Sequence, residues 1–365
     1  MTDNKNIKQW IRPEIQGLSA YHVPDPGNLI KLDAMENPYT WPQTMIDEWQ
    51  VVLKDTALNR YPDPGSRSLQ QEIRQAFDIP ADMDVILGNG SDEIIQIIAM
   101  AVAAPDRVIL APDPGFVMYK MIAQFVGMQY VGVPLKLDDF SLDMDAMKTA
   151  IAQHQPAVIF IAYPNNPTGN LFERQQVEEI LQLAPGLVVL DEAYAAFADD
   201  SFMQNLGQYS NLLVMRTVSK MGLAGLRLGY LAGPSNCVME FDKIRLPYNI
   251  NVLTQVSAEF ALKHKDILDE QTSLIRQERT RVFEQLSVIP GMTVYPSQAN
   301  FILFRVANDR ANELFDALKQ GGVLIKNLAN AGGLLQGCLR VTVGKPQEND
   351  RFIEIVSQFF FFLEQ

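Results

Sequence analysis

The 365-residue sequence has few cysteines and no long apolar run. Its two cysteines, Cys237 and Cys338, are too few for a disulfide framework and predict a reducing, cytoplasmic environment. Residues 1–10 lack the apolar core of a signal peptide. Apolar runs such as Ile94–Ala104 are too short or too interrupted to span a bilayer. We therefore expect neither a secretion signal nor a membrane anchor.

Positive charge is also scarce, with 30 Lys and Arg against 43 Asp and Glu and a net charge of −13. This balance argues against nucleic acid or an anionic membrane as the main partner, although a locally basic pocket can still bind a small anion. The three histidines, His22, His154 and His264, are scattered along the chain. We therefore expect no metal site.

The length of the chain suggests two domains. Short apolar runs alternate with helix-length spacers, which predicts an α/β fold with a mostly parallel sheet covered by helices on both faces. The runs are Val85–Leu87, Val108–Leu110, Tyr130–Val133, Val158–Ala162, Leu187–Leu190, Leu212–Met215 and Gly229–Ala232.

The remaining sequence predicts a smaller α+β domain. Residues from about 250 to 285 are typical of a long helix, and helices are also expected at about 309–320 and 347–363. The strands expected there are Thr293–Tyr295, Phe301–Val306, Val323–Lys326 and Leu339–Val343. We assign residues 1–45 to an N-terminal arm or part of the small domain, 46–250 to the large domain, and 251–365 to the long helix and small domain. The arm either folds with the small domain or reaches another subunit.

Polar clusters follow four of the predicted strands, where ligands bind in open α/β sheets. They are Gly88–Glu93, Tyr163–Gly169, Asp191–Tyr194 and Arg216–Lys220, the last followed by Leu223–Arg227. Together they offer the groups that a phosphorylated aromatic aldehyde requires.

The first cluster predicts a phosphate site. Gly88 and Gly90 permit a tight turn, and the N–H groups of Ser91 and Asp92 open a helix, whose N-terminus attracts anions. An ordinary glycine turn with Ser91 as the N-cap is the simpler alternative. Glu93 replaces the third glycine of a dinucleotide fingerprint, which argues against a dehydrogenase.

Two further residues point to the chemistry. Asp191 could be an N-cap or metal ligand, but it also suits an anion beneath a pyridine nitrogen, where it would keep that nitrogen protonated. Lys220 could be an ordinary surface lysine, but at a strand end it could form a Schiff base.

The other candidates would hold the same ligand. Arg227 suits a bidentate grip on phosphate, with Thr217 and Ser219 adding hydroxyl donors. Asn166 and Tyr194 could both donate to a phenolic oxygen. Phe116 could stack on a pyridine ring, although a single aromatic residue is more often part of a core. The prediction of a site for a phosphorylated aromatic aldehyde depends on these residues occurring together at successive strand ends.

The sequence resembles the fold type I, class-II-like pyridoxal-phosphate-dependent aminotransferases, and within them the histidinol-phosphate aminotransferase family. The resemblance covers nearly the whole chain. The segments that carry it are Met35–Tyr39, Arg60–Asp63, Gly88–Glu93, Asn165–Gly169, Asp191–Tyr194, Ser219–Arg227, Pro247–Asn249, Ala299–Phe301 and Cys338–Gly344.

The resemblance implies pyridoxal 5'-phosphate bound as a Schiff base to Lys220, which would also move protons. It implies the catalytic and cofactor-binding roles described above for Asp191, Tyr194 and the other candidates. It further implies a homodimer with shared sites, in which Tyr61 reaches the phosphate of the neighbouring subunit. The substrate-binding residues that it implies are Tyr21, Asn166, Lys326 and Arg340.

Two positions depart from the family pattern. Phe116 stands where tyrosine is frequent, which keeps stacking but removes a hydroxyl. Lys326 stands where many members have a second substrate-binding arginine, which keeps the charge but loses the bidentate fork.

The expected reaction is amino transfer between glutamate and imidazole acetol phosphate, giving histidinol phosphate in histidine biosynthesis. The alternatives are an aromatic amino acid aminotransferase, a threonine-phosphate decarboxylase with similar cofactor chemistry, and a non-catalytic binding or regulatory relative. The presence of Lys220, Asp191 and Arg227 argues against the last of these.

Overall fold

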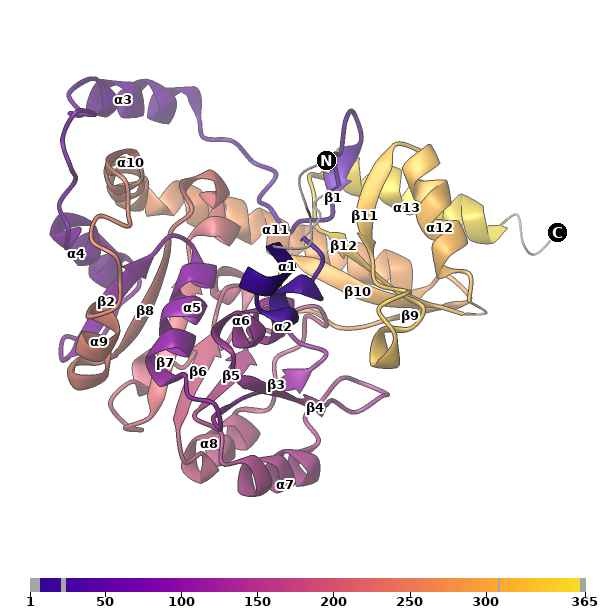
Figure 1. Cartoon of the computed structure of the whole chain (residues 1–365). Coiled ribbons are helices and arrows are strands. Elements are labelled where there is room, and N and C mark those ends of the chain that lie inside the picture. The colour runs from indigo at the N-terminus through magenta and orange to yellow at the C-terminus, as the bar shows by residue number, and fades with distance from the viewer. Residues whose placement is uncertain (1–6, 21–23, 308, 362–365) are drawn as a thin grey trace.

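The computed structural model describes residues 7–20, 24–307 and 309–361. It contains one seven-stranded and one five-stranded sheet (Figure 1). Within the described residues no helix is both long and apolar enough to cross a membrane.

The large sheet has the strand order β2-β8-β7-β6-β5-β3-β4, and all neighbouring strands are parallel except the two pairs that involve β8. The mostly parallel sheet is therefore as predicted. Its strands are β2 (Met83–Gly88), β3 (Val108–Asp113), β4 (Gln129–Pro134), β5 (Val158–Ala162), β6 (Leu187–Asp191), β7 (Leu212–Thr217) and β8 (Gly229–Pro234).

Helices cover both faces of this sheet because its central strands are apolar on both sides. In β5, Val158 and Phe160 belong to one core cluster, whereas Ile159 and Ile161 belong to the cluster on the opposite face. On the face of Phe160 pack α5 (Ser91–Val102), α6 (Val117–Val126) and α9 (Ser235–Asp242). On the other face pack α4 (Arg67–Ala76), α7 (Met144–His154), α8 (Arg174–Leu183) and α10 (Val252–Lys263), with α3 (Gln43–Lys54) beside α10.

The small sheet has the order β1-β11-β12-β10-β9 and is antiparallel except for the pair β1–β11. Its strands are β1 (Ile30–Leu32), β9 (Met292–Val294), β10 (Phe301–Val306), β11 (Val323–Asn327) and β12 (Cys338–Thr342). The helices α12 (Ala311–Gln320) and α13 (Pro346–Phe361) pack on it with part of α11 (Lys265–Ser287). Residues 1–45, which we assigned to an arm or to part of the small domain, thus supply the edge strand β1 of the small sheet, while the proposed domain bounds stay a prediction.

The long helix expected from about 250 to 285 is two helices. α10 ends at Lys263 and α11 begins at Lys265, because His264 between them has φ −109° and ψ 34°, outside the helical range. The short elements are α1 (Ile7–Trp10), α2 (Pro13–Gln16) and the 3₁₀ turns η1 (Ala195–Phe197), η2 (Met203–Asn205), η3 (Ser219–Met221), η4 (Ala224–Leu226) and η5 (Gly333–Leu335).

Candidate active site

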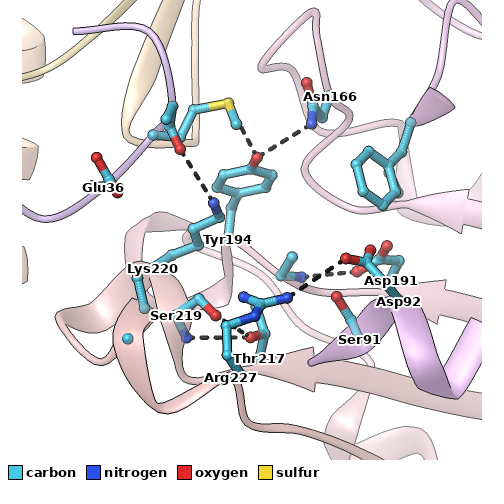
Figure 2. A pocket seen from close by; sticks show the side chains of 17 residues that line it. Glu36, Ser91, Asp92, Asn166, Asp191, Tyr194, Thr217, Ser219, Lys220 and Arg227 are labelled. Atoms are coloured by element: carbon cyan, nitrogen blue, oxygen red, sulfur yellow. Dashed lines mark hydrogen bonds and ion pairs between the residues drawn. The ribbon is translucent and has the colours of Figure 1, made fainter. Parts of the chain in front are cut away.

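A pocket of about 420 Å³ lies at the carboxyl ends of β5, β6 and β7, beside the first turn of α5 (Figure 2). A ligand site is expected at this edge of an open α/β sheet. Most of the residues singled out in the sequence line it, namely Ser91, Asp92, Phe116, Asn166, Asp191, Tyr194, Thr217, Ser219, Lys220 and Arg227.

Lys220 lies in the short turn η3, directly after β7, and points toward Tyr194 (Figure 2). Its Nζ lies 3.4 Å from the carbonyl oxygen of Ala34 and 5.8 Å from the centre of the Tyr194 ring. Burial of the amine, and then the positive charge of Arg340, lower the pKa of Lys220 to about 8. The neutral, nucleophilic form of the amine is thus more accessible than in an ordinary lysine.

Asp191 is the last residue of β6 and is buried. Burial raises the pKa of its carboxyl to about 6, although hydrogen bonds from Tyr119 and the Ala193 backbone oppose the rise. The hydroxyl of Tyr119 donates to Oδ2 at 2.6 Å, and the Ala193 N–H donates to Oδ1 at 3.2 Å. Such a carboxylate suits a cationic partner inside the pocket, because a positive charge would favour its ionised form.

Sequence reasoning missed Tyr119. It follows Phe116 by three residues, at the start of α6, so both rings lie on the same side of that helix and meet edge to face at 5.5 Å. Tyr119 also stacks on Phe160 at 4.8 Å. The spacing from Phe116 was the available signal, but a buried aromatic residue is usually part of a core.

The residues at the start of α5, with Arg227, form an anion cradle in the pocket wall. Gly90 stands at the N-cap position and Ser91 is the first residue of α5, so the first turn of this helix, whose N–H groups have no partner within the helix, lines the pocket with Ser91 and Asp92. Arg227 forms an ion pair with Asp92 at 3.6 Å. A Cβ on Gly90 would lie 2.7 Å from Nη2 of Arg227, so the glycine allows the guanidinium to approach.

Hydroxyl groups complete the cradle. Oγ1 of Thr217, the last residue of β7, lies 2.8 Å from Oγ of Ser219, and the Ser219 N–H donates to the same Thr217 oxygen at 3.2 Å. Guanidinium, hydroxyl and helix N-terminal donors at one place form the set that binds phosphate in proteins.

Asn166 and Tyr194 meet on the side facing the small sheet, with the Asn166 amide donating to the Tyr194 hydroxyl at 3.3 Å. Arg340 reaches them from β12, and its Nη1 donates to Oδ1 of Asn166 at 2.5 Å. Its Nη2 donates to the carbonyl oxygen of Asp33 at 3.2 Å. The small sheet therefore contributes a buried cation to a site built mostly on the large one.

Three of the described candidates, Tyr61, Lys326 and Arg340, do not line this pocket, although Arg340 bonds to the pocket residue Asn166. Tyr61 is 81% exposed and stacks on Tyr248 at 4.5 Å. Lys326 lies opposite Arg340 in the β11–β12 register and is half-buried, but it does not line the pocket. Tyr21 lies outside the described residues.

The chemistry of this donor set fits pyridoxal 5'-phosphate. An anion cradle suits the phosphate, a buried carboxylate suits a protonated ring nitrogen, and an amine with a lowered pKa suits the aldehyde. Phe116 adds an aromatic ring to the wall of the pocket.

Residues 27–356 match the family model of aminotransferase class I and II, and the chain belongs to this family. Its members depend on pyridoxal 5'-phosphate, so the predicted enzyme class and cofactor are confirmed.

Individual relatives with high sequence identity narrow the comparison to one branch of the family. "Histidinol-phosphate aminotransferase 2" of Nitrosococcus oceani is 56% identical, over 95% of this chain and 96% of the relative. The protein of the same name from Cupriavidus pinatubonensis is 51% identical, over 97% of each chain. The crystal structure of the histidinol-phosphate aminotransferase from Clostridium acetobutylicum has a TM-score of 0.83 and 26% identity, over 92% of this chain and 100% of that chain. These matches confirm the predicted fold type and the resemblance noted in the sequence.

Proposed function

We propose that this protein transfers an amino group between glutamate and imidazole acetol phosphate, giving 2-oxoglutarate and histidinol phosphate in histidine biosynthesis. The observation that carries the proposal is identity of 56% and 51%, over nearly full length, to relatives named for this reaction. A cytoplasmic location belongs to the proposal and is supported by the free cysteines Cys237 and Cys338.

Pyridoxal 5'-phosphate supplies an electron-withdrawing ring that stabilises negative charge on the substrate carbon. Asp191 would hold the proton on the ring nitrogen, and Tyr119 would keep that carboxylate ionised and oriented. Asn166 and Tyr194 would donate to the phenolic oxygen, and Phe116 would pack against the ring.

The anion cradle would hold the phosphate. Ser91 and Asp92 would contribute the N–H groups at the start of α5, Thr217 and Ser219 their hydroxyls, and Arg227 its guanidinium. Arg227 would supply the positive charge for the phosphate, because it is the one cation among these five residues.

Lys220 would hold the cofactor covalently through Nζ and would move protons at the same atom once the substrate has replaced it. A base works best with a pKa near the working pH, and the pKa of about 8 meets this requirement. The amine lies within the pocket between Tyr194 and the carbonyl of Ala34, which fixes where it can deliver a proton.

Arg340 would bind the anionic group of the substrate, because its planar fork can hold a carboxylate or a phosphate. Its bond to Asn166 would place the substrate group beside the phenolic-oxygen side of the site. Lys326 and Tyr21 would assist with the phosphorylated substrate.

The assembly would be a homodimer in which Tyr61 serves the pocket of the neighbouring subunit. In its own chain the Tyr61 ring is 81% exposed, and it stacks on Tyr248, which is also exposed. Large exposed aromatic residues that meet in one patch are typical of an interface.

The test is a panel of amino donors and acceptors with the purified protein loaded with pyridoxal 5'-phosphate. We expect histidinol phosphate with 2-oxoglutarate to give the highest kcat/KM. A higher kcat/KM for phenylalanine or tyrosine would favour an aromatic aminotransferase, and release of carbon dioxide from threonine phosphate would favour a decarboxylase. Either result would contradict the proposal.

A further inference from the structure

Behind the pocket, Glu192 and Arg216 form an ion pair that is almost completely enclosed. Nε and Nη2 of Arg216 donate to Oε2 of Glu192 at 2.9 and 2.7 Å, and the two side chains are 13% and 0% exposed. Burying such a pair adds little stability, because the loss of hydration offsets the attraction. The two guanidinium N–H groups that donate to the one oxygen Oε2 do, however, hold the backbones that carry Glu192 and Arg216 at a defined spacing.

The pair also fixes a third segment. Oε1 of Glu192 accepts the Phe202 N–H at 2.6 Å, and Oε2 accepts the Ser201 hydroxyl at 2.8 Å. Nη2 of Arg216 donates to the same Ser201 oxygen at 2.7 Å. The end of β7, the residue after β6 and the segment at Ser201 and Phe202 are therefore joined by one hydrogen-bonded unit.

Each member of the pair is adjacent in sequence to a pocket residue. Glu192 follows Asp191, Arg216 precedes Thr217, and the Glu192 N–H donates to the Met215 carbonyl at 2.8 Å. Successive side chains of an extended strand point to opposite faces. Accordingly, Glu192 and Arg216 line a second cavity of about 320 Å³, whereas Asp191 lines only the first pocket.

The segment between the two anchor points of Glu192 carries another pocket residue. Tyr194 lies between Glu192 and Ser201, so its backbone is fixed at both ends by the same carboxylate. A shift of this carboxylate would move Asp191, Tyr194 and the end of β7 relative to one another.

We infer that Glu192 and Arg216 are a positioning pair that sets the distance between the carboxylate for the ring nitrogen and the hydroxyls for the phosphate. The inference deepens the proposed function and rests on it, since it assumes that Asp191 and Thr217 contact the cofactor. Neither member of the pair touches the cofactor pocket, so the pair acts through the backbone of its neighbours.

The test uses Glu192→Gln, which keeps the shape and removes the charge, and Arg216→Lys, which keeps the charge and removes the fork. The matched control is Arg174→Lys. Arg174 pairs with Asp200 with Nε–Oδ2 at 3.0 Å and donates to the Ser201 carbonyl at 2.7 Å, but it comes from α8 rather than from a strand end. Three quantities are measured for each protein: the Kd of pyridoxal 5'-phosphate, the pH midpoint of the bound cofactor's visible band, and the Tm of the cofactor-free protein.

We expect Glu192→Gln to raise the cofactor Kd roughly tenfold or more, the size typical for losing a charged hydrogen bond. The pH midpoint should also rise, because a displaced Asp191 leaves the ring less positive and the attached nitrogen more basic. Arg216→Lys should shift both quantities less, since it retains the charge. Arg174→Lys should leave both near the wild-type values.

A lower Tm with an unchanged Kd and pH midpoint in both variants would overturn the inference, because the pair would then be structural only. If Glu192→Gln does not fold, the cofactor Kd and the pH midpoint of Arg216→Lys test the inference by the same criterion. A wild-type protein that binds no pyridoxal 5'-phosphate would overturn the proposed function as well. Wild-type binding with unaffected variants overturns this inference alone.

Discussion

The hydroxyl of Tyr119 lies 2.6 Å from Oδ2 of Asp191 and donates a hydrogen bond to it inside the protein. Both residues are buried, and the bond opposes the rise in the pKa of Asp191 that burial causes. Tyr119 therefore acts on the ionisation of the carboxylate proposed to face the ring nitrogen.

Replacing Tyr119 with Phe should weaken cofactor binding while leaving the fold intact, because the ring can still stack on Phe160. Loss of a hydrogen bond to a charged group costs about 1.5–3 kcal/mol, or roughly 10–150-fold in an equilibrium constant. Equilibrium dialysis of pyridoxal 5'-phosphate measures the effect. Tyr163→Phe is the matched control, since the buried Tyr163 donates to Asp200 at 2.8 Å outside the pocket. Equal affinities of both variants would contradict the prediction.

Reduction with borohydride should fix the cofactor to Lys220 and abolish the visible band. Peptide mass spectrometry then identifies the modified lysine. Lys220→Ala should remove the attachment and leave at most slow residual turnover, because both the amine and the base are lost. Lys265→Ala is the control, since Lys265 lines the second cavity and not the pocket. Modification at a different lysine would rule out the assignment.

The rate at which cofactor-free protein takes up pyridoxal 5'-phosphate should depend on pH through Lys220. The attacking form is the neutral amine, so with a pKa of about 8 the rate should rise with pH up to that value and then level off. Below it the rate should fall about tenfold per pH unit. Stopped-flow absorbance from pH 6 to 10 follows the uptake, and free Nα-acetyllysine corrects for the titration of the cofactor itself.

The sign of the Arg340 effect provides a second check of this pH dependence. Its positive charge disfavours the protonated amine, so Arg340→Gln should raise the midpoint above that of the wild type. A wild-type midpoint near 10.5, the ordinary lysine value, would show that the pocket does not perturb Lys220.

Arg340 and Lys326 should differ in the two half-reactions. Arg340 bonds to the pocket residue Asn166, so Arg340→Ala should weaken the binding of glutamate and of histidinol phosphate alike, by about 1.5–3 kcal/mol or more. Lys326→Ala should weaken the binding of histidinol phosphate more than that of glutamate. Lys326→Arg should preserve or improve the binding of histidinol phosphate. Single-turnover measurements of each half-reaction separate the effects. Equal, negligible effects of Lys326→Ala on both substrates would eliminate its role.

Hybrid dimers should test the shared site. Lys220→Ala protein mixed with a Tyr61→Ala variant that binds the cofactor poorly should regain part of the activity, because some hybrids contain one intact pocket. Val288→Ala is the matched control for Tyr61→Ala, since Val288 is also 80% exposed but outside this patch. Full activity of a protein that sediments as a monomer at assay concentration would refute the shared site.

Much of the fold could be predicted because apolar strands and polar strand ends leave a clear local pattern in the sequence. The same pattern placed Asp191, Thr217 and Lys220 around one pocket, since the carboxyl ends of parallel strands meet at one edge of the sheet. A local sequence pattern predicts little about contacts between segments that are far apart in the chain. The bond between Arg340 and Asn166 depends on how the small sheet packs against the large one.

Other misses have the same origin. Strand β1 is only three residues long and exists because β11 offers it an edge, which no local periodicity reveals. We assigned no role to Glu192 from the sequence, because the alternation that turns it toward Arg216 matters only when β7 lies beside β6. Tyr119 has the pattern of a core residue, and only the packing of α6 on the large sheet brings its hydroxyl to the carboxylate at the end of β6.

Because β1 pairs with β11, the small sheet can be completed only late in synthesis of the chain. All seven strands of the large sheet lie between Met83 and Pro234, so that sheet can form while β11 and β12 are still untranslated. β1, the first strand in the sequence, has no partner strand until β11 has been synthesised. A polypeptide interrupted after α12 would therefore leave β1 without its partner strand and would lack Arg340.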